Sequence, residues 1–293
     1  MLTEALEGLN IHPDGTYVDA TFGGGGHSRA IMERLGEDGR LLAFDQDADA
    51  AANTIDDPRF TLIGENFRHM KAFLRLSGVR KVDGVLADLG VSSHQFDTAE
   101  RGFSTRMDGE LDMRMDTRGD VTARDLVNSL DEEALGRLLR LYGELPNARQ
   151  MAKAIVAARR DKEIATTFDL RQAVSRHLPR GMENKYLAML FQALRIEVNG
   201  ELDALKEMLT QSTEMLCDGG RLVVICYHSL EDRIVKNYMK TGNFEGQLEK
   251  DFYGNVLAPL RMVSRGAIQA SDEEQQCNSR SRSAKLRVAE RRL

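Results

Sequence analysis

The sequence contains few cysteines, and they form no recognisable pattern. Only Cys217, Cys226 and Cys277 occur among 293 residues, and an odd number without paired spacing fits neither a disulfide framework nor a structural zinc site. Reduced thiols, as in a cytosolic protein, are therefore expected. No apolar run approaches the roughly 20 residues that span a bilayer, and the N-terminus lacks the basic and apolar regions of a secretion signal. The sequence predicts a cytoplasmic protein without a membrane partner.

The chain also lacks an overall excess of positive charge. Its net charge is -6, which argues mildly against a nucleic-acid partner. The charge is unevenly distributed, however, because residues 149–162 carry five basic residues against one acidic residue, and residues 276–293 carry six against one. These local basic segments permit RNA binding, and ordinary solvated helix and tail surfaces explain them equally well.

No metal site is expected. The loop 108–116 is rich in carboxylates, but a calcium-binding EF-hand loop requires glycine at its sixth position, where Met113 stands. We interpret this loop as an ordered segment of alternating charges.

Short apolar runs alternate with helical patterns over about the first 90 residues. This alternation is typical of βαβ units and a parallel sheet. The sequence therefore predicts an α/β, Rossmann-like fold. We expect strands at 16–22, 40–44, 60–63 and 82–87, with helices at 28–35, 48–53 and 70–76.

The alternation stops after Asp88. The chain is then loop-like to about Asp120 and helical to about Arg195. A helix at 199–216, with Gly219-Gly220 as its C-cap, precedes a strand at 221–226. The simplest interpretation is a helical insert at 96–198 within a domain built from 1–95 and 199–293. Segments 260–263 and 285–288 are expected to pair as edge strands.

Four consecutive glycines, Gly23 to Gly26, connect the first strand to a helix. Glycine allows positive φ angles and a close approach of ligand at the helix N-terminus. Asp45 follows Gly23 by 22 residues, near the spacing at which a carboxylate accepts the ribose hydroxyls of a nucleoside cofactor. The third glycine of the dinucleotide fingerprint is absent, since Ser28 or Arg29 stands there. This disfavours NAD and favours S-adenosylmethionine, which has no pyrophosphate.

Asp88 ends the fourth predicted strand, at the edge where open α/β sheets bind ligands. Transfer of a methyl group to an amine whose lone pair is delocalised into a ring benefits from an acceptor for the amine N–H. Asp88 is the candidate catalytic acceptor, and the backbone carbonyls of Leu89 and Gly90 are alternatives. A purely structural role of Asp88 in the turn also stays open.

Tyr227 and His228 follow the fifth predicted strand and are further catalytic candidates. An aromatic ring at this edge could stack on a flipped base. The pattern Ser229-x-x-Asp232 before an apolar helix also resembles a capping box, so a structural interpretation of the same turn stays open.

Together these segments closely resemble the bacterial ribosomal RNA small-subunit methyltransferase H family, also called MraW. The matching stretches occur in order along nearly the whole chain, which makes the resemblance highly specific. They are residues 21–28, 88–95, 101–104, 111–116, 191–196, 228–236 and 280–291.

The resemblance implies a class I S-adenosylmethionine-dependent methyltransferase sheet with an inserted all-helical substrate-recognition domain. It implies N4-methylation of a cytidine in the decoding region, at the P site, of 16S rRNA in the small ribosomal subunit, with S-adenosylhomocysteine as the second product. No obligatory protein partner is expected, and a homodimer is left open. Carried over position by position, the cofactor contacts are Gly25, Gly26, His27, Asp45, Phe67, Asp88 and Gln95.

Three other functions stay open on the sequence. A methyltransferase for a protein or a small molecule would not need basic surfaces for phosphate contacts. A non-catalytic RNA-binding assembly factor could keep the same fold, because fold does not determine function. An NAD-dependent oxidoreductase is disfavoured by the missing glycine.

Overall fold

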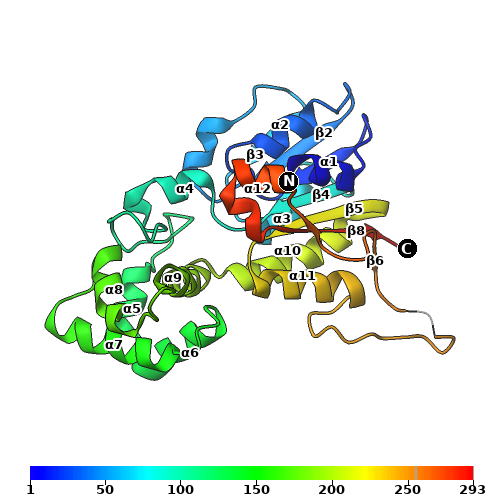
Figure 1. Cartoon of the computed structure of the whole chain (residues 1–293). Coiled ribbons are helices and arrows are strands. Elements are labelled where there is room, and N and C mark those ends of the chain that lie inside the picture. The colour runs from blue at the N-terminus through cyan, green and yellow to red at the C-terminus, as the bar shows by residue number, and fades with distance from the viewer. Residues whose placement is uncertain (255, 293) are drawn as a thin grey trace. The chain divides into compact units, whose positions relative to one another are not determined.

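The computed structural model describes residues 1–254 and 256–292 and divides into two compact units (Figure 1). Unit 1 comprises Met1–Gly90 and Leu202–Leu293, and unit 2 comprises Val91–Glu201. The last residue of the basic segment 276–293, Leu293, lies outside the described residues. Across the described part of the chain, no helix is long and apolar enough to cross a membrane.

Unit 1 contains a sheet whose described strands follow the order β3-β2-β1-β4-β5-β8-β6, with β7 paired to β8. The strands β1 to β5 run parallel, and β6 and β7 each pair with β8 antiparallel, as β8 does with β5. The strand order changes direction at β1 and β4, which creates the topological switch point where such sheets bind ligands. The predicted α/β fold is confirmed. The strands are β1 (Thr16–Asp19), β2 (Arg40–Phe44), β3 (Phe60–Ile63), β4 (Val82–Asp88), β5 (Leu216–Cys226), β6 (Leu260–Met262), β7 (Ile268–Gln269) and β8 (Lys285–Arg291).

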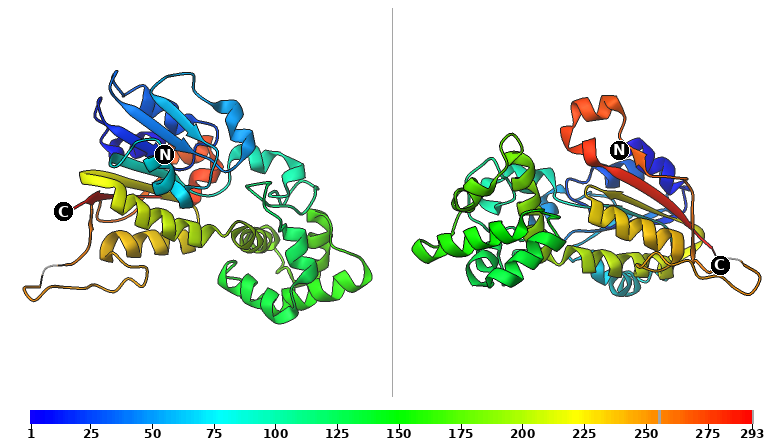
Figure 2. Two further views of the ribbon diagram at one scale, coloured as in Figure 1. Left: turned by 180° about the vertical axis from the view of Figure 1, so that it is seen from behind. Right: turned by 60° about the horizontal axis from the view of Figure 1, so that its bottom comes forward.

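Helices cover both faces of this sheet (Figure 2). Along β4, Val85 and Ala87 belong to one apolar core and Leu86 to the other, because successive side chains of a strand point to opposite faces. Burial on both faces explains why the strands are nearly continuous apolar runs. The helices of unit 1 are α1 (Leu2–Leu9), α2 (Gly26–Met32), η1 (Ala48–Asn53), η2 (Phe67–His69), α3 (Met70–Leu76), α10 (Glu201–Met215), α11 (Ser229–Thr241), α12 (Asp272–Cys277) and η5 (Ser279–Ser283).

The structure corrects the predicted helix end at Gly219-Gly220. Helix α10 ends at Met215, and both glycines lie within β5. The register of β5 against β4 shifts in this segment, where Gly219 has a φ of 76°. These glycines therefore allow an irregularity within a strand. A pair of glycines at the end of a helix looks the same in the sequence, so the pattern did not distinguish the two.

Two other predictions need adjustment. Segments 260–262 and 285–291 do pair, as expected, but β8 lies between β5 and β6 and is not an edge strand. The first predicted strand, 16–22, ends at Asp19. Beyond Asp19 the backbone still bonds to both neighbours of β1. The Ala20 N–H donates to Leu86 O of β4, and the Phe22 N–H donates to Phe44 O of β2.

Unit 2 is helical and has its own apolar core, which includes Leu135, Leu139, Met151 and Leu190. Its described helices are α4 (Ser93–Asp97), η3 (Ala99–Arg101), α5 (Ala123–Ser129), α6 (Glu132–Leu141), α7 (Ala148–Asp161), α8 (Thr167–Val174), η4 (Ser175–His177) and α9 (Glu183–Asn199).

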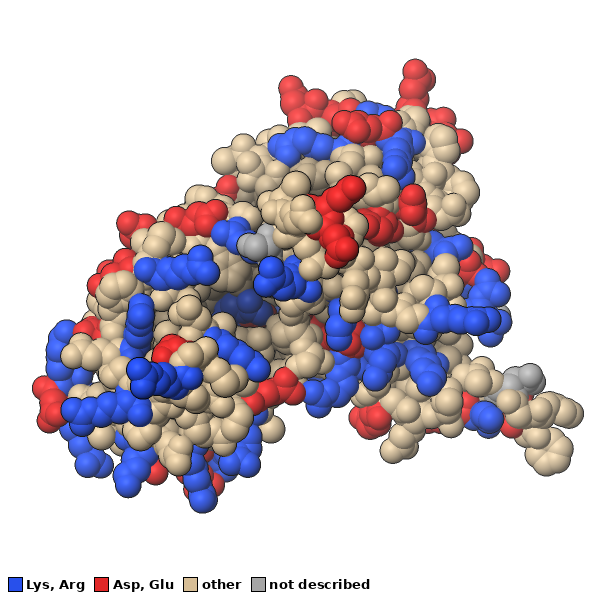
Figure 3. Space-filling model, viewed as in Figure 1, with Lys and Arg blue, Asp and Glu red and all other residues tan. Residues whose placement is uncertain are grey.

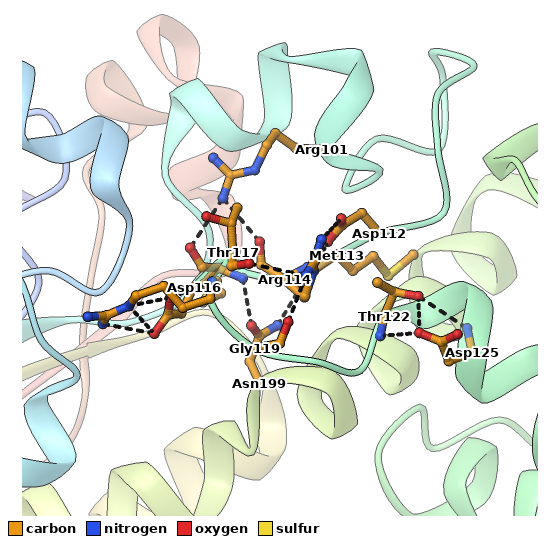
Figure 4. A network of polar contacts seen from close by, with 12 residues as sticks. Arg101, Asp112, Met113, Arg114, Asp116, Thr117, Gly119, Thr122, Asp125 and Asn199 are labelled. Carbon is orange, nitrogen blue, oxygen red and sulfur yellow. Dashed lines mark hydrogen bonds and ion pairs between the residues drawn. The ribbon is translucent and has the colours of Figure 1, made fainter.

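The long loop of unit 2 between η3 and α5 is ordered by side chains that bind its backbone (Figure 4). The Arg114 guanidinium bonds to the Asp112 carboxylate at 2.7 and 2.9 Å and to two loop carbonyls. Asn199 donates to Met113 O at 2.8 Å and accepts from the Met115 N–H at 2.7 Å. Two of the carboxylates that made this loop resemble a metal site therefore have arginine partners, since Asp112 bonds to Arg114 and Asp116 bonds to Arg118. A third, Asp108, accepts from the Phe168 N–H at 3.2 Å.

We expect Asn199→Ala to loosen this loop locally. Both methionine backbone groups would lose their partner in a buried position, at a cost of about 1–3 kcal/mol. The Met115 amide should then exchange with solvent about tenfold faster or more in a hydrogen-exchange measurement.

Asn128→Ala is the matched control. Asn128 makes the equivalent pair of bonds, to the Ile164 N–H at 3.1 Å and to Ile164 O at 2.8 Å. It should accelerate exchange at Ile164 and leave Met115 unchanged. An unchanged Met115 amide in Asn199→Ala would show that the loop is held by other contacts.

Candidate active site

The carboxyl ends of the parallel strands place most of the predicted site residues along one edge of the unit 1 sheet. Asp88 ends β4, and the other predicted residues of this unit lie in the segments that follow β1, β2, β3 and β5. Parallel strands end at the same edge, which is where such sheets bind ligands. The residues at this edge are Gly25, Gly26, His27, Asp45, Phe67, Asp88, Tyr227 and His228.

The glycine loop after β1 is clamped by Asp19, a residue that the sequence analysis did not single out. Asp19 is 1% exposed. Its carboxylate accepts from the Thr21 N–H at 3.1 Å and from the Ser28 hydroxyl at 2.7 Å. Burial raises the pKa of Asp19, and His27 and these hydrogen bonds oppose that rise. The sequence does contain a signal for this role, because Asp19 is the only acidic residue in the apolar strand that precedes the glycines.

The four glycines divide into two roles. Gly23 and Gly25 have φ angles of 50° and 75°, which L-residues rarely adopt. A Cβ on Gly25 would also lie 2.8 Å from the Arg29 guanidinium and 3.0 Å from the Phe22 ring. A Cβ on Gly24 or Gly26 would meet nothing within 4 Å. The first pair shapes the turn, and the second pair leaves open space beside it.

Asp45 ties the glycine loop to the end of β2. Its carboxylate accepts from the Gly23 N–H at 2.7 Å and from the Asp47 N–H at 2.9 Å. Burial raises the pKa of Asp45 to about 6, although these two hydrogen bonds oppose the rise. Each carboxylate oxygen has a further lone pair, so Asp45 can still accept hydroxyl groups.

Phe67 begins η2 after the third strand and packs, half-buried, against the core that includes Met70 and Leu205. Its neighbour Asn66 caps η2 by accepting from the Arg68 N–H and donates to the Gln46 side chain at 2.7 Å. The ring is thus held in place by its own segment. Its packing on an adenine stays a prediction.

Asp88 is held from three sides. Its backbone N–H donates to the Thr21 hydroxyl at 2.7 Å. Its Oδ1 accepts from the Tyr227 hydroxyl at 2.9 Å, and its Oδ2 lies 3.7 Å from His27 Nδ1. Burial raises the pKa of Asp88, while His27 and Tyr227 oppose the rise. The side chain keeps 27% of its surface exposed, so it can reach a ligand.

Tyr227 is a hydrogen-bond donor whose ring lies close to the backbone just after β4. Burial raises the pKa of its phenol, and the neighbouring Asp88 raises it further, so the hydroxyl keeps its proton at neutral pH. Gly90 has a φ of 99°, and a Cβ there would lie 3.4 Å from Tyr227 Cδ2. The glycine therefore lets the backbone pass close to the ring.

The structure corrects the predicted capping box of α11. His228 is the N-cap, because it has the extended backbone of a cap (φ −135°, ψ 164°), and Ser229 is already the first helical residue. His228 Nδ1 accepts from the Glu231 N–H at 3.4 Å. The Glu231 carboxylate accepts from the backbone N–H groups of Tyr227 and His228, at 2.9 and 3.3 Å. Asp232 is not part of this cap and instead bonds to Lys285 and Arg287.

Glu231 is the second residue that the sequence analysis missed. It is 3% exposed, and it fixes the turn that carries Tyr227. Glutamate at the third helical position is the usual signal for this role. The sequence prediction took Ser229 as the N-cap instead of His228, so Glu231 was not at the expected position.

Gln95, the remaining predicted cofactor contact, lies in unit 2. It is 4% exposed and is the third helical residue of α4. Its side chain accepts from the Ser92 N–H at 3.1 Å, and its own N–H donates to the Ser92 hydroxyl at 3.2 Å. Gln95 thus has a structural function as a cap within its own unit.

Comparisons with known proteins agree over the full length of the chain. The model of the MraW methylase family matches residues 1–292. The Flavobacterium psychrophilum protein named ribosomal RNA small subunit methyltransferase H is 57% identical over 292 residues, covering 100% of both chains. The protein of the same name from Bacteroides thetaiotaomicron is 57% identical over 292 residues, covering 100% of this chain and 96% of its own. That from Cytophaga hutchinsonii is 56% identical over 293 residues, covering 99% and 98%.

Substitution of two neighbouring glycines should separate folding from ligand binding. Gly25→Ala should lower the free energy of unfolding by about 1–2 kcal/mol, because alanine is strained at positive φ. Gly26→Ala should leave stability unchanged and weaken binding of S-adenosylhomocysteine, since its methyl group enters the open space beside the loop. Denaturant unfolding and calorimetric titration measure the two effects. Normal ligand affinity in Gly26→Ala would contradict the assignment of that space to the ligand.

Proposed function

The chain belongs to the MraW methylase family, and on that premise we propose that it transfers a methyl group from S-adenosylmethionine to N4 of a cytidine in the decoding region of 16S ribosomal RNA. The names of its relatives support ribosomal RNA of the small subunit as the substrate. The observation that carries the proposal is the Asp88 carboxylate, held by Tyr227 at 2.9 Å at the sheet edge that also carries the glycine loop. This arrangement offers an acceptor for an amine N–H next to a cofactor site.

The cofactor is S-adenosylmethionine, and the residues of unit 1 fit it. Gly24 and Gly26 face open space that a side chain would fill. The buried Nε2 of His27 has no hydrogen-bond partner among the described residues, so a polar ligand group can satisfy it. When bound, S-adenosylmethionine would supply a methyl group carried on a positively charged sulfur. The methyl group is transferred, and the sulfur keeps the electron pair of the broken bond.

The proposed binding roles follow from the polar groups that remain available. The loop at Gly25 and Gly26 allows close approach of the ligand, and Asp45 accepts the ribose hydroxyls. Phe67 packs on the base. Gln95 is kept as a cofactor contact on the resemblance alone, because its side chain already caps α4.

Asp88 is proposed as the catalytic acceptor. It accepts a hydrogen bond from the N4 amine, which directs the lone pair of that nitrogen towards the methyl group. The bond from nitrogen to the methyl carbon forms as the sulfur–carbon bond breaks, and the released N4 proton passes to the carboxylate. The raised pKa of Asp88 makes it a stronger base than an exposed aspartate. Tyr227 and His228 are positioning residues, the first through its bond to Asp88 and the second as the cap of α11.

Basic side chains on unit 2 support an RNA substrate. Arg149, Lys153 and Arg160 are exposed along α7, at spacings that place them on one face of a helix. Asn147 donates to His177 O at 2.8 Å, which brings η4, with the exposed Arg176, to the start of α7. Figure 3 shows lysine and arginine side chains spread over this unit.

The C-terminal basic segment, residues 276–293, supports an RNA substrate less strongly than the sequence indicated. Lys285 and Arg287 bond to Asp232 at 3.2 and 2.7 Å, and Arg291 donates to Pro259 O at 3.0 Å. These three cations serve the β8 region of the sheet and do not form a free tail. Arg282 and Arg292 are exposed.

The direct test uses small ribosomal subunits from a strain that lacks this methylation, incubated with methyl-labelled S-adenosylmethionine. We expect N4-methylcytidine at one site when the digested RNA is analysed by mass spectrometry. Asp88→Asn should lower kcat at saturating cofactor by roughly a hundredfold or more. Asp88 is also a proposed cofactor contact, so the affinity for S-adenosylhomocysteine should fall as well, but by a smaller factor than kcat. Cofactor binding without any methyl transfer to RNA would contradict the proposal and would favour a protein substrate.

Cofactor affinity should depend on pH through Asp45. Ribose hydroxyls bind the charged carboxylate, and the pKa of Asp45 in the free protein is about 6. Protonation below that pH therefore competes with binding. S-adenosylhomocysteine should bind about tenfold more weakly at pH 5 than at pH 8, because each pH unit below a pKa reduces the charged form about tenfold.

Asp45→Asn provides the control for this pH dependence. The variant should bind more weakly at all pH values and should lose most of the slope between pH 5 and pH 8. Equal slopes for the wild type and Asp45→Asn, measured by calorimetry, would assign the pH dependence to another group.

A further inference from the structure

Helix α11 carries three exposed cations, Arg233, Lys236 and Lys240, here called the α11 basic stripe. At 3.6 residues per turn, these positions fall within about 60° of one another around the helix axis. At 1.5 Å per residue they extend over about 10 Å. Lysine and arginine side chains gather over α11 on the surface of unit 1 (Figure 3).

The two acidic residues of α11 do not neutralise this stripe. Glu231 is 3% exposed, and its carboxylate accepts from the backbone N–H groups of Tyr227 and His228. Asp232 bonds to Arg287 and Lys285. Partial burial opposes ionisation of Asp232, but these two cations outweigh it and lower the pKa of that carboxyl. Both carboxylates thus bond to groups outside the stripe, and the exposed side of α11 carries the three cations of the stripe.

The stripe begins close to the reacting groups. Tyr227, whose hydroxyl bonds to Asp88, directly precedes the α11 N-cap, and Arg233 lies only six residues beyond Tyr227. The same turn therefore fixes both the Tyr227–Asp88 pair and the start of the stripe. A polyanion bound along α11 would lead away from the sheet edge where the target base reacts.

We propose that the α11 basic stripe binds consecutive phosphates of the RNA strand that carries the target cytidine. This inference rests on the proposed function and extends it. It assigns contacts with RNA phosphates to unit 1 in addition to those proposed for unit 2. Lysine is a strongly hydrated point charge suited to phosphate. At roughly 3.4 Å of helix axis per phosphate in one strand of a duplex, a stripe of about 10 Å spans three or four phosphates of that strand. Phosphate contacts fix the register of a nucleic acid and carry no sequence information.

The double variant Lys236→Ala/Lys240→Ala tests the stripe without touching the cofactor site. The dependence of the RNA dissociation constant on salt should become shallower by about 1.4 in log–log slope, because each single-strand phosphate contact contributes about 0.7. The KM for RNA should rise several-fold at moderate salt. The kcat at saturating RNA and the affinity for S-adenosylhomocysteine should stay the same, and the latter also reports correct folding.

Arg34→Ala/Arg75→Ala is the matched control, because it removes two exposed cations of unit 1 that lie outside α11. It should leave the salt slope unchanged. Lys236→Arg/Lys240→Arg should keep the wild-type slope, and Lys236→Gln/Lys240→Gln should repeat the loss with longer side chains. Equal effects of the α11 and control variants would overturn the inference.

Two further outcomes distinguish failure of the inference about α11 from failure of the proposed function. Unchanged binding of naked RNA together with weaker binding of assembled small subunits would assign the stripe to a ribosomal protein and overturn the assignment to RNA. Absence of N4-methylcytidine with the wild-type protein would refute the proposed function, whatever the variants do. A changed salt slope alone would then still show that α11 binds RNA.

Discussion

The position of the Asp88 carboxylate is the constraint on which the rest of the site depends. Three separate segments of unit 1 hold it: the Thr21 hydroxyl after β1, His27 on α2 and the Tyr227 hydroxyl after β5. The strand order brings these segments together, because β4 lies between β1 and β5. The sheet topology thus creates the chemical environment of one side chain, and partial burial of that side chain raises its pKa.

Buried acids have a second, structural function at the same edge. Asp19 clamps the glycine loop, Asp45 ties that loop to β2, and Glu231 fixes the turn before α11. Each accepts hydrogen bonds from backbone N–H groups that have no partner within a regular element, and an unpaired buried N–H is costly. The proposed cofactor site and the proposed catalytic pair of Asp88 and Tyr227 are therefore held by one set of buried carboxylates.

Much of this fold follows from local patterns in the sequence. The strands at 40–44 and 60–63 and the helix at 70–76 have the predicted bounds, since apolar runs and periodicity determine such elements. The glycine loop and Asp45 were predictable because their spacing alone brings them together. The glycines in β5 were misread because their irregularity depends on pairing with the distant strand β4. The cap formed by His228 and the clamp formed by Asp19 were missed although their partners, Glu231 and Ser28, lie close in sequence. Roles for Phe67 and Gln95 came from the resemblance only.

The central claim is that Asp88 accepts the N–H of the cytosine amine, and a crystal structure with S-adenosylhomocysteine and cytidine monophosphate tests it most directly. The measured quantity is the distance from cytosine N4 to the Asp88 carboxylate oxygens. We predict a hydrogen bond of about 2.7–3.2 Å, with the Tyr227 hydroxyl still bonded to Asp88. A cytosine amine bonded to the backbone carbonyl of Leu89 or Gly90, with Asp88 beyond hydrogen-bond distance, would contradict the account.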